Sequence, residues 1–383
     1  MRDKGAQAGL RIGLFAHRLA GRHPTGIGRY FRELVCALDA LTGDQKLVVS
    51  STREVQDAAW IPSGVQKTVV RWPRRPVQLA WSLGAGPRLE RSLGPLSVAH
   101  LLQPFPPVRT RAPQLVTVHD LFPIEHPSWY SSSERWTFRV SIELLIRRRV
   151  TVVVPSQYVA ERVGSSLDVE PSRVRVVPLG VSGTFSDGGS AGDIAAVCRR
   201  FDVSPDRFAV CLGTVSTRKN VIALVRAMAK LAGSGLPLVM IGPDGHGARE
   251  VDAEIARLDG RCRVVRTGFL PDADTAALVQ AATVLLHPAL GEGFGLVPLE
   301  AMAVGTPVIA SRISSVPEVV GPAAVLVDEP TEPAGWAQAM ADLLGDEDRR
   351  SALARAGAER ARQFSWAETA RRMVDLYREL ARA

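Results

Sequence analysis

Two glutamates and the glycine turn beside the first of them are the residues of this chain best suited to chemistry. Glu292 and Glu300 lie eight positions apart, and Gly293-Phe294-Gly295 follows Glu292 directly. Glycines let a backbone turn sharply and let a ligand approach it closely. Carboxylates accept hydrogen bonds from hydroxyl groups. The spacing therefore favours a ligand that presents hydroxyls to the glutamates and a second group to the turn.

Short apolar runs on both sides of this turn predict the elements that hold it. Residues 282–286 and 306–310 are apolar and rich in β-branched side chains, which is typical of buried parallel strands. Residues 295–304 between them then form a helix. The first N–H groups of a helix have no partner within it, and with the helix dipole they form an anion site. Phosphate at this helix start, flanked by two hydroxyl-accepting carboxylates, describes a sugar nucleotide.

Two further turns carry polar residues directly after apolar runs. These are His119-Asp120 and Arg218-Lys219. Ligands of open α/β sheets bind at the carboxyl ends of the strands, and fixed cations there suit a diphosphate. Each feature taken alone has a plainer interpretation: an acidic loop, a capped histidine turn or a solvated basic loop. Their combination favours one ligand site.

The alternation of apolar runs with helical patterns predicts an α/β fold, and a length of 383 residues predicts two domains. The segment 183–193 is rich in glycine and serine and is the best candidate for a linker. We therefore expect a first domain over residues 1–182 and a second over residues 194–363. A final helix at 364–383 is expected to pack back toward the first domain.

The composition is that of an ordinary globular protein, with 46% hydrophobic and 22% charged residues, a net charge of +8 and a pI near 9.8. Arginine lies beside tryptophan at 71–75 and around Trp81, and three arginines stand at 147–149. Such patches suit peripheral contact with an anionic membrane, although an arginine-rich composition alone explains them equally well. No motif indicates nucleic-acid binding.

Cysteines and acidic residues give no sign of a disulfide framework or a metal site. The four cysteines are scattered without a Cys-x-x-Cys pair, which favours reduced thiols and a cytoplasmic protein. No apolar run approaches the roughly 20 residues of a membrane span, and the N-terminal run is too short for a signal peptide. Asp272 and Asp274 precede a plain helical pattern, so we interpret them as residues of its start. We expect no metal and no cofactor.

Seven motifs, in this order along the chain, resemble those of retaining glycosyltransferases of the GT-B fold, in family 4. They occupy residues 25–30, 118–123, 213–220, 267–270, 292–302, 305–311 and 316–319. The resemblance covers nearly the whole chain and is strongest over residues 205–325. It implies two Rossmann-like, doubly wound domains facing each other across a cleft, with the donor mainly on the second and the acceptor on the first.

The resemblance also implies roles for single residues. Glu300 is expected to hold the ribose hydroxyls and Glu292 to lie near the donor sugar. Arg218 and Lys219 are expected to neutralise the diphosphate, and His119 to contact the sugar close to the reacting centre. The other implied donor contacts are Gly26, Gly268, Phe269, Leu270, Gly293, Phe294, Gly295, Leu296 and Val297, and the implied acceptor contacts are Tyr30 and Asp120.

The activity implied is transfer of a sugar, with retention and without metal, from a nucleotide-sugar donor to a saccharide or lipid-linked acceptor. Mannose from GDP-mannose is the preferred donor, because mannosyltransferases of the family share the Arg-Lys-Asn turn at 218–220. Thr214 departs from the family, many members of which carry arginine there. A UDP- or dTDP-sugar with a small-molecule acceptor is the alternative. An epimerase, a phosphorylase and a non-catalytic sugar-binding protein are weaker alternatives.

Overall fold

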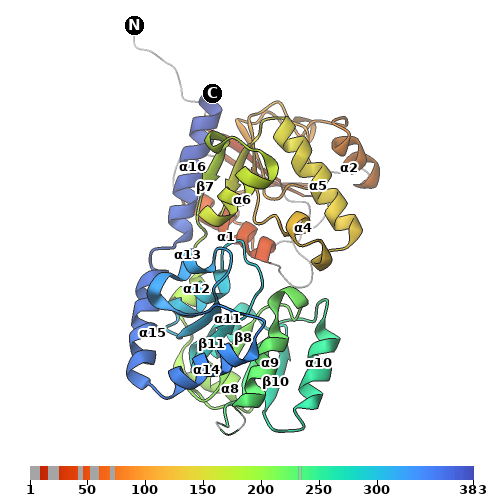
Figure 1. Ribbon diagram of the computed structural model, residues 1–383. Helices are drawn as coiled ribbons and strands as arrows, with labels where there is room; N and C mark the ends of the chain where they lie inside the picture. Colours follow the sequence, from red (N-terminus) through yellow and green to blue (C-terminus); the bar gives the residue numbers. More distant parts are fainter. Residues whose placement is uncertain are drawn as a thin grey trace. The chain divides into compact units, whose positions relative to one another are not determined.

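The computed structural model describes residues 9–15, 26–41, 46–51, 60–69, 74–231, 233 and 235–383, which form two compact units (Figure 1). The first unit comprises Met1–Leu179 together with Trp366–Ala383, and the second comprises Gly180–Ser365. Both alternate strands with helices, as the sequence predicts.

The described part of the first unit contains one wholly parallel sheet with the strand order β3-β2-β1-β4-β5-β6-β7. Successive strands run outward from β1 in one direction and from β4 in the other, so the order reverses between β1 and β4. Its strands are β1 (Arg11–Phe15), β2 (Lys46–Ser51), β3 (Gln66–Val69), β4 (Val98–Leu101), β5 (Gln114–Thr117), β6 (Thr151–Val154) and β7 (Val174–Val176). Its helices are α1 (Gly26–Ala40), α2 (Arg74–Ser82), α3 (Glu90–Leu93), α4 (Phe122–Glu125), α5 (Ser132–Arg147), α6 (Gln157–Leu167) and α16 (Trp366–Arg382).

The second unit repeats this plan with the order β10-β9-β8-β11-β12-β13, which reverses between β8 and β11. Its strands are β8 (Ala209–Leu212), β9 (Leu238–Ile241), β10 (Val264–Gly268), β11 (Val284–His287), β12 (Val308–Ser311) and β13 (Val325–Val327). Its helices are α7 (Gly183–Asp187), α8 (Ala191–Arg200), α9 (Val221–Lys230), α10 (Ala248–Arg257), α11 (Asp272–Ala281), α12 (Leu296–Ala303), α13 (Val316–Val320), α14 (Pro333–Leu344) and α15 (Glu347–Ala361). These two sheets confirm the predicted fold class of Rossmann-like halves.

Burial explains why these strands are so apolar. Every side chain of β9, β11 and β12 is buried, because a parallel sheet carries helices on both faces. The core of the second unit includes Leu224, Met240 and Leu286, each at most 2% exposed. Replacing Leu286 by alanine in such a core costs about 2–5 kcal/mol.

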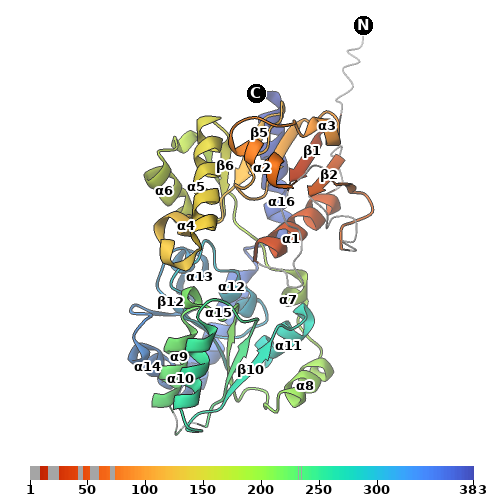
Figure 2. The same ribbon diagram turned by 90° about the vertical axis from the view of Figure 1, so that its right-hand side faces the viewer.

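The C-terminal helix α16 belongs to the first unit. It packs on α1 and β4, and its buried face includes Met373 and Tyr377 (Figure 2). Among the helices of the described ranges, none combines the length and apolarity that a membrane crossing requires.

Two expectations about local structure need correction. Residues 183–193, predicted as a linker, include α7 and the start of α8, and they lie within the second unit. Ser190 starts α8 because its side chain accepts a hydrogen bond from the backbone of Asp193. Trp81, expected at a surface patch, is 2% exposed, and its indole N–H donates to the carbonyl of Pro87 at 2.8 Å. Residues 71–73 of that patch lie outside the described ranges.

Candidate functional site

The second unit gathers charged side chains at the point where its strand order reverses. Arg218 and Lys219 follow β8, whereas His287 ends β11 and Glu292 lies in the turn between β11 and α12. Because β8 and β11 are neighbouring parallel strands, both turns leave the same edge of the sheet. We call these four residues the charged cluster.

Glu292 is the centre of the charged cluster. Lys219 donates a hydrogen bond from Nζ to Glu292 Oε1. The same oxygen lies 3.6 Å from Arg218 Nη1 and 3.4 Å from His287 Nε2. Arg218 Nη1 also donates to the carbonyl of Gly291 at 2.7 Å, which fixes the guanidinium against the turn. Two cations surround one carboxylate, so the cluster retains a positive surplus.

The cluster determines the protonation of its members. Burial alone would raise the pKa of Glu292, but Lys219, the hydrogen bond with His287 and Arg218 together hold that pKa well below its usual range. Burial lowers the pKa of His287, and Glu292 opposes that shift only in part. Glu292 is therefore an anion and His287 a neutral imidazole at neutral pH.

The turn that carries Glu292 is fixed by its own backbone and by Ser315. Gly295 precedes α12 with φ at +112°, a conformation that a side chain would strain. The Ser315 hydroxyl lies 2.8 Å from the carbonyl oxygens of both Glu292 and Phe294. The start of α12 is thereby held next to the charged cluster, as an anion site requires.

The other implied donor residues surround this turn or lie at the end of β10. Glu300 is on α12 and is 1% exposed, so its carboxylate lies deeper than the turn. Gly268 ends β10, Phe269 is 38% exposed and Leu270 is buried. Gly293, Leu296 and Val297 are partly exposed, and Phe294 and Gly295 are buried.

In the first unit, His119 follows β5 and is held by the chain around it. Its Nε2 lies 3.3 Å from the carbonyl oxygen of Leu102, and its ring packs edge-on against Tyr30 with centroids 4.7 Å apart. A carbonyl can only accept, so Nε2 carries the proton and Nδ1 keeps its lone pair. Burial lowers the pKa of His119 to about 4, so the ring is neutral at pH 7.

A buried chain of hydrogen bonds lies behind His119. Tyr377 of α16 bonds to His100 Nδ1 at 2.7 Å, and His100 Nε2 bonds to the Thr117 hydroxyl at 2.8 Å. Thr117 in turn lies 3.0 Å from the Tyr30 hydroxyl. Burial, with a smaller effect of His119, lowers the pKa of His100 to about 3 and keeps it neutral. We call Tyr377, His100, Thr117 and Tyr30 the neutral network.

The two residues implied as acceptor contacts, Tyr30 and Asp120, both make hydrogen bonds within the first unit. Tyr30 is 2% exposed and its hydroxyl is bonded to Thr117, so it supports His119 from inside the unit, and its contact with an acceptor stays a prediction. Asp120 accepts a hydrogen bond from the backbone of Phe122 at 3.2 Å, which fixes the start of α4. Gly26 begins α1 and is exposed, whereas Thr25 before it lies outside the described residues.

Several functional candidates were not singled out from the sequence. His100 and His287 each stand within or at the end of an apolar strand, where a histidine is a visible exception. Tyr377 and Ser315 carried no such signal. Within the described residues, no three His, Cys, Asp or Glu side chains gather as a metal site would need. All four cysteines are free.

Comparison with known proteins covers both units. The model of the family "Glycosyl transferases group 1" matches residues 201–360, and that of "Glycosyltransferase Family 4" matches residues 24–183. The chain belongs to the group 1 glycosyltransferases of the GT-B fold. Its membership confirms the resemblance that the motifs suggested.

Individual relatives are moderately similar. D-inositol 3-phosphate glycosyltransferase of Corynebacterium kroppenstedtii is 31% identical over 289 residues, which cover 71% of this chain but only 63% of that relative. O-antigen chain mannosyltransferase B of Escherichia coli is 26% identical over 269 residues, 70% of each chain. The structure of Anabaena Alr3699/HepE in complex with UDP and glucose has a TM-score of 0.75 at 18% identity and covers 97% of this chain and 100% of its own.

Proposed function

We propose that the chain transfers a sugar from a nucleotide-sugar donor to a hydroxyl group of an acceptor, with retention of the anomeric configuration. The observation that supports this most is the charged cluster beside the start of α12, at the strand reversal of the second unit. A helix start and two fixed cations are suited to the diphosphate of such a donor.

The chemistry follows from where negative charge develops. Breaking the bond between the anomeric carbon and the phosphate leaves a nucleoside diphosphate, so charge grows on the departing oxygen. Arg218, Lys219 and the start of α12 stabilise that charge electrostatically. In a retaining reaction the acceptor attacks from the side of the leaving group, and the departing phosphate takes the acceptor's proton.

Glu292 has a positioning role in this proposal. Its carboxylate is ionised and bonded to Lys219, so it holds the lysine and accepts hydrogen bonds from sugar hydroxyls, and it is not required as a nucleophile. Neutral His119 offers Nδ1 as an acceptor for a sugar hydroxyl. Glu300 is proposed to accept hydrogen bonds from the ribose.

The preferred donor is GDP-mannose, in keeping with the O-antigen mannosyltransferase relative. A UDP-sugar is the second candidate, because the structurally similar Anabaena protein was solved with UDP and glucose. Thermal unfolding with GDP, UDP and dTDP tests this choice. GDP should raise the midpoint of thermal unfolding most. A larger rise with UDP would instead favour a UDP-sugar as the donor. A protein that none of the three stabilises would contradict a nucleotide-sugar donor.

The reaction is proposed to need no metal, since cationic side chains are available to stabilise the leaving group. Transfer activity in excess EDTA should equal that in magnesium. Activity that EDTA abolishes and magnesium restores would overturn this part.

A cytoplasmic location with contact to the inner face of a membrane is proposed for a lipid-linked saccharide acceptor. The exposed apolar side chains of α2 and α5 support it: Leu79 is 55% exposed and Trp136 57%, and Leu83 just after α2 is 75% exposed. Leu83→Glu should weaken flotation with vesicles of phosphatidylglycerol. Equal flotation of the wild type and this variant would exclude contact through this leucine.

A further inference from the structure

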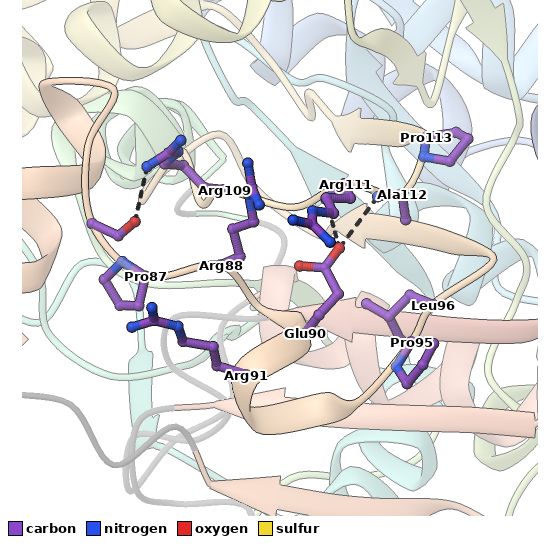
Figure 3. A pocket seen from close by; sticks show the side chains of 11 residues that line it. Pro87, Arg88, Glu90, Arg91, Pro95, Leu96, Arg109, Arg111, Ala112 and Pro113 are labelled. Carbon is purple, nitrogen blue, oxygen red and sulfur yellow. Dashed lines mark hydrogen bonds between the residues drawn. The ribbon is translucent and has the colours of Figure 1, made fainter.

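The first unit contains a second candidate site, a pocket of about 880 Å³ (Figure 3). It lies at the amino ends of the strands, whereas His119 lies at their carboxyl ends. Its residues precede β4 and β5, whereas His119 follows β5. Arg88, Arg91, Arg109 and Arg111 line it, and we call it the arginine pocket.

The chain segments that carry these arginines are fixed to each other. The backbone N–H of Leu89 donates to the carbonyl of Arg109 at 2.8 Å, and Arg109 Nη1 donates to the carbonyl of Gly86 at 3.1 Å. Trp81 secures the same loop through its hydrogen bond to Pro87. The arginines therefore project from a preorganised backbone, which reduces the entropy lost on binding.

Among the described residues, Glu90 is the one acidic residue that lines the pocket, and one oxygen of its carboxylate already accepts hydrogen bonds. Its Oε1 accepts hydrogen bonds from the Thr110 hydroxyl at 2.5 Å, from the Arg111 N–H at 2.5 Å and from the Ala112 N–H at 3.3 Å. Burial opposes ionisation, but these hydrogen bonds lower the pKa of Glu90 and keep it charged. Its carboxylate thus fixes the loop at 110–112.

Four guanidinium groups against one carboxylate leave the arginine pocket strongly positive. Within the part of the chain that the structure describes, the side chains of Arg88, Arg91 and Arg111 have no hydrogen bond and no ion pair. The positive charge also affects neighbouring Arg148. Burial, and to a smaller extent the charge of Arg109, lower the pKa of Arg148. The positive charge of the pocket arginines is therefore available to an anionic ligand.

We propose that the arginine pocket binds a small ligand through a phosphate ester or diphosphate. Guanidinium groups match the oxygens of phosphate in pairs, and several of them together favour a multiply charged group over a single carboxylate. The volume suits a small molecule, and the apolar lining residues Leu96, Pro87, Pro95 and Pro113 can contact its uncharged part. This site lies apart from the donor site proposed above and does not depend on it.

Titration calorimetry of the full-length chain with inorganic pyrophosphate tests the proposal. No nucleotide is added, because a nucleoside diphosphate carries the same charged group and would compete with pyrophosphate for the arginine pocket. The test variant is Arg88→Gln with Arg111→Gln, because these side chains have no bonds to lose in the described structure. The matched control is Arg199→Gln with Arg355→Gln, two exposed arginines outside the pocket. Lys219→Met is titrated in parallel.

Pyrophosphate should bind the wild type, the control and Lys219→Met equally, and the test variant at least about tenfold more weakly, as expected for loss of a charged hydrogen bond. A second arm uses dihexanoyl phosphatidate below its micelle concentration. Arginine-dependent binding in either arm supports the proposal and tells a free phosphate from a lipid headgroup. Binding unchanged by Arg88→Gln with Arg111→Gln in both arms, or absent in the wild type, overturns it. Weakening by Lys219→Met alone would assign pyrophosphate to the donor site instead.

Discussion

The candidate sites of the two units differ in their electrostatics, because one is built from charged side chains and the other from neutral ones. In the second unit, ionised Lys219, Arg218 and Glu292 lie at one edge of the sheet, and neutral His287 stands against them. In the first unit, His119 packs against the neutral network. The hydroxyl groups and the imidazole of that network form a buried chain of hydrogen bonds. The difference matches the proposed division of labour: charge is needed where a diphosphate departs, whereas orientation is needed where sugar hydroxyls are held.

The largest effect should come from the charged cluster itself. Lys219→Met removes a cation aimed at the leaving group, and loss of one such electrostatic contact costs about 100- to 1000-fold in kcat. The measurement is steady-state transfer with the donor identified by thermal unfolding. Lys230→Met is the matched control, since Lys230 is exposed at the end of α9. An equal loss of kcat in both variants would contradict a specific role of Lys219 at the leaving group.

The loss of unfolding free energy caused by Glu292→Gln should depend on pH, because Glu292 is charged in the folded protein. The pKa of Glu292 is depressed in the folded protein, so its contribution is complete above the ordinary glutamate pKa and is lost as the pH falls through the folded value. At pH 7 the variant should lose about 3 kcal/mol of unfolding free energy, because Lys219 and Arg218 lose the negative charge that lies between them. At pH 3 the loss should be smaller. Exposed Glu329→Gln is the control, and a loss independent of pH would contradict the assignment.

This contrast was only partly predictable from the sequence. Arg218, Lys219 and Glu292 could be assigned to one site because each follows an apolar strand and the glycine turn is local. The neutral network joins α1, β4, β5 and α16, and no local pattern shows that Tyr377 meets His100. For the same reason the sequence does not show that the Tyr30 hydroxyl meets Thr117, since periodicity shows that a helix has a buried face but not what its side chains contact.

The neutral network should respond to acid in a different pH range. The pKa of His100 is about 3 when folded and about 6.5 when unfolded, so between these values only the unfolded chain binds the proton. Stability should therefore fall as the pH drops below 6.5, by about 1.4 kcal/mol per pH unit for this histidine. Chemical denaturation at several pH values should show that the unfolding free energy of His100→Gln falls less steeply with decreasing pH than that of the wild type, by that amount. His246→Gln is the comparison, and identical slopes for His100→Gln and the wild type would contradict a buried neutral His100.

The smallest effect should come from the far end of the network. Tyr377→Phe leaves one nitrogen of His100 without its hydroxyl, which should cost about 1–2 kcal/mol of unfolding free energy. If the network also orients His119, kcat should fall a few-fold while the affinity for the nucleoside diphosphate stays constant. Loss of stability with unchanged kcat would limit the network to a structural role.

The most direct test of the donor site is a crystal structure of this chain with the nucleoside diphosphate that stabilises it most. Diphosphate oxygens should lie within hydrogen-bonding distance of Lys219 or Arg218 and of the first N–H groups of α12. A diphosphate bound elsewhere, with Lys219 and Arg218 making no contact to it, would contradict the proposed donor site.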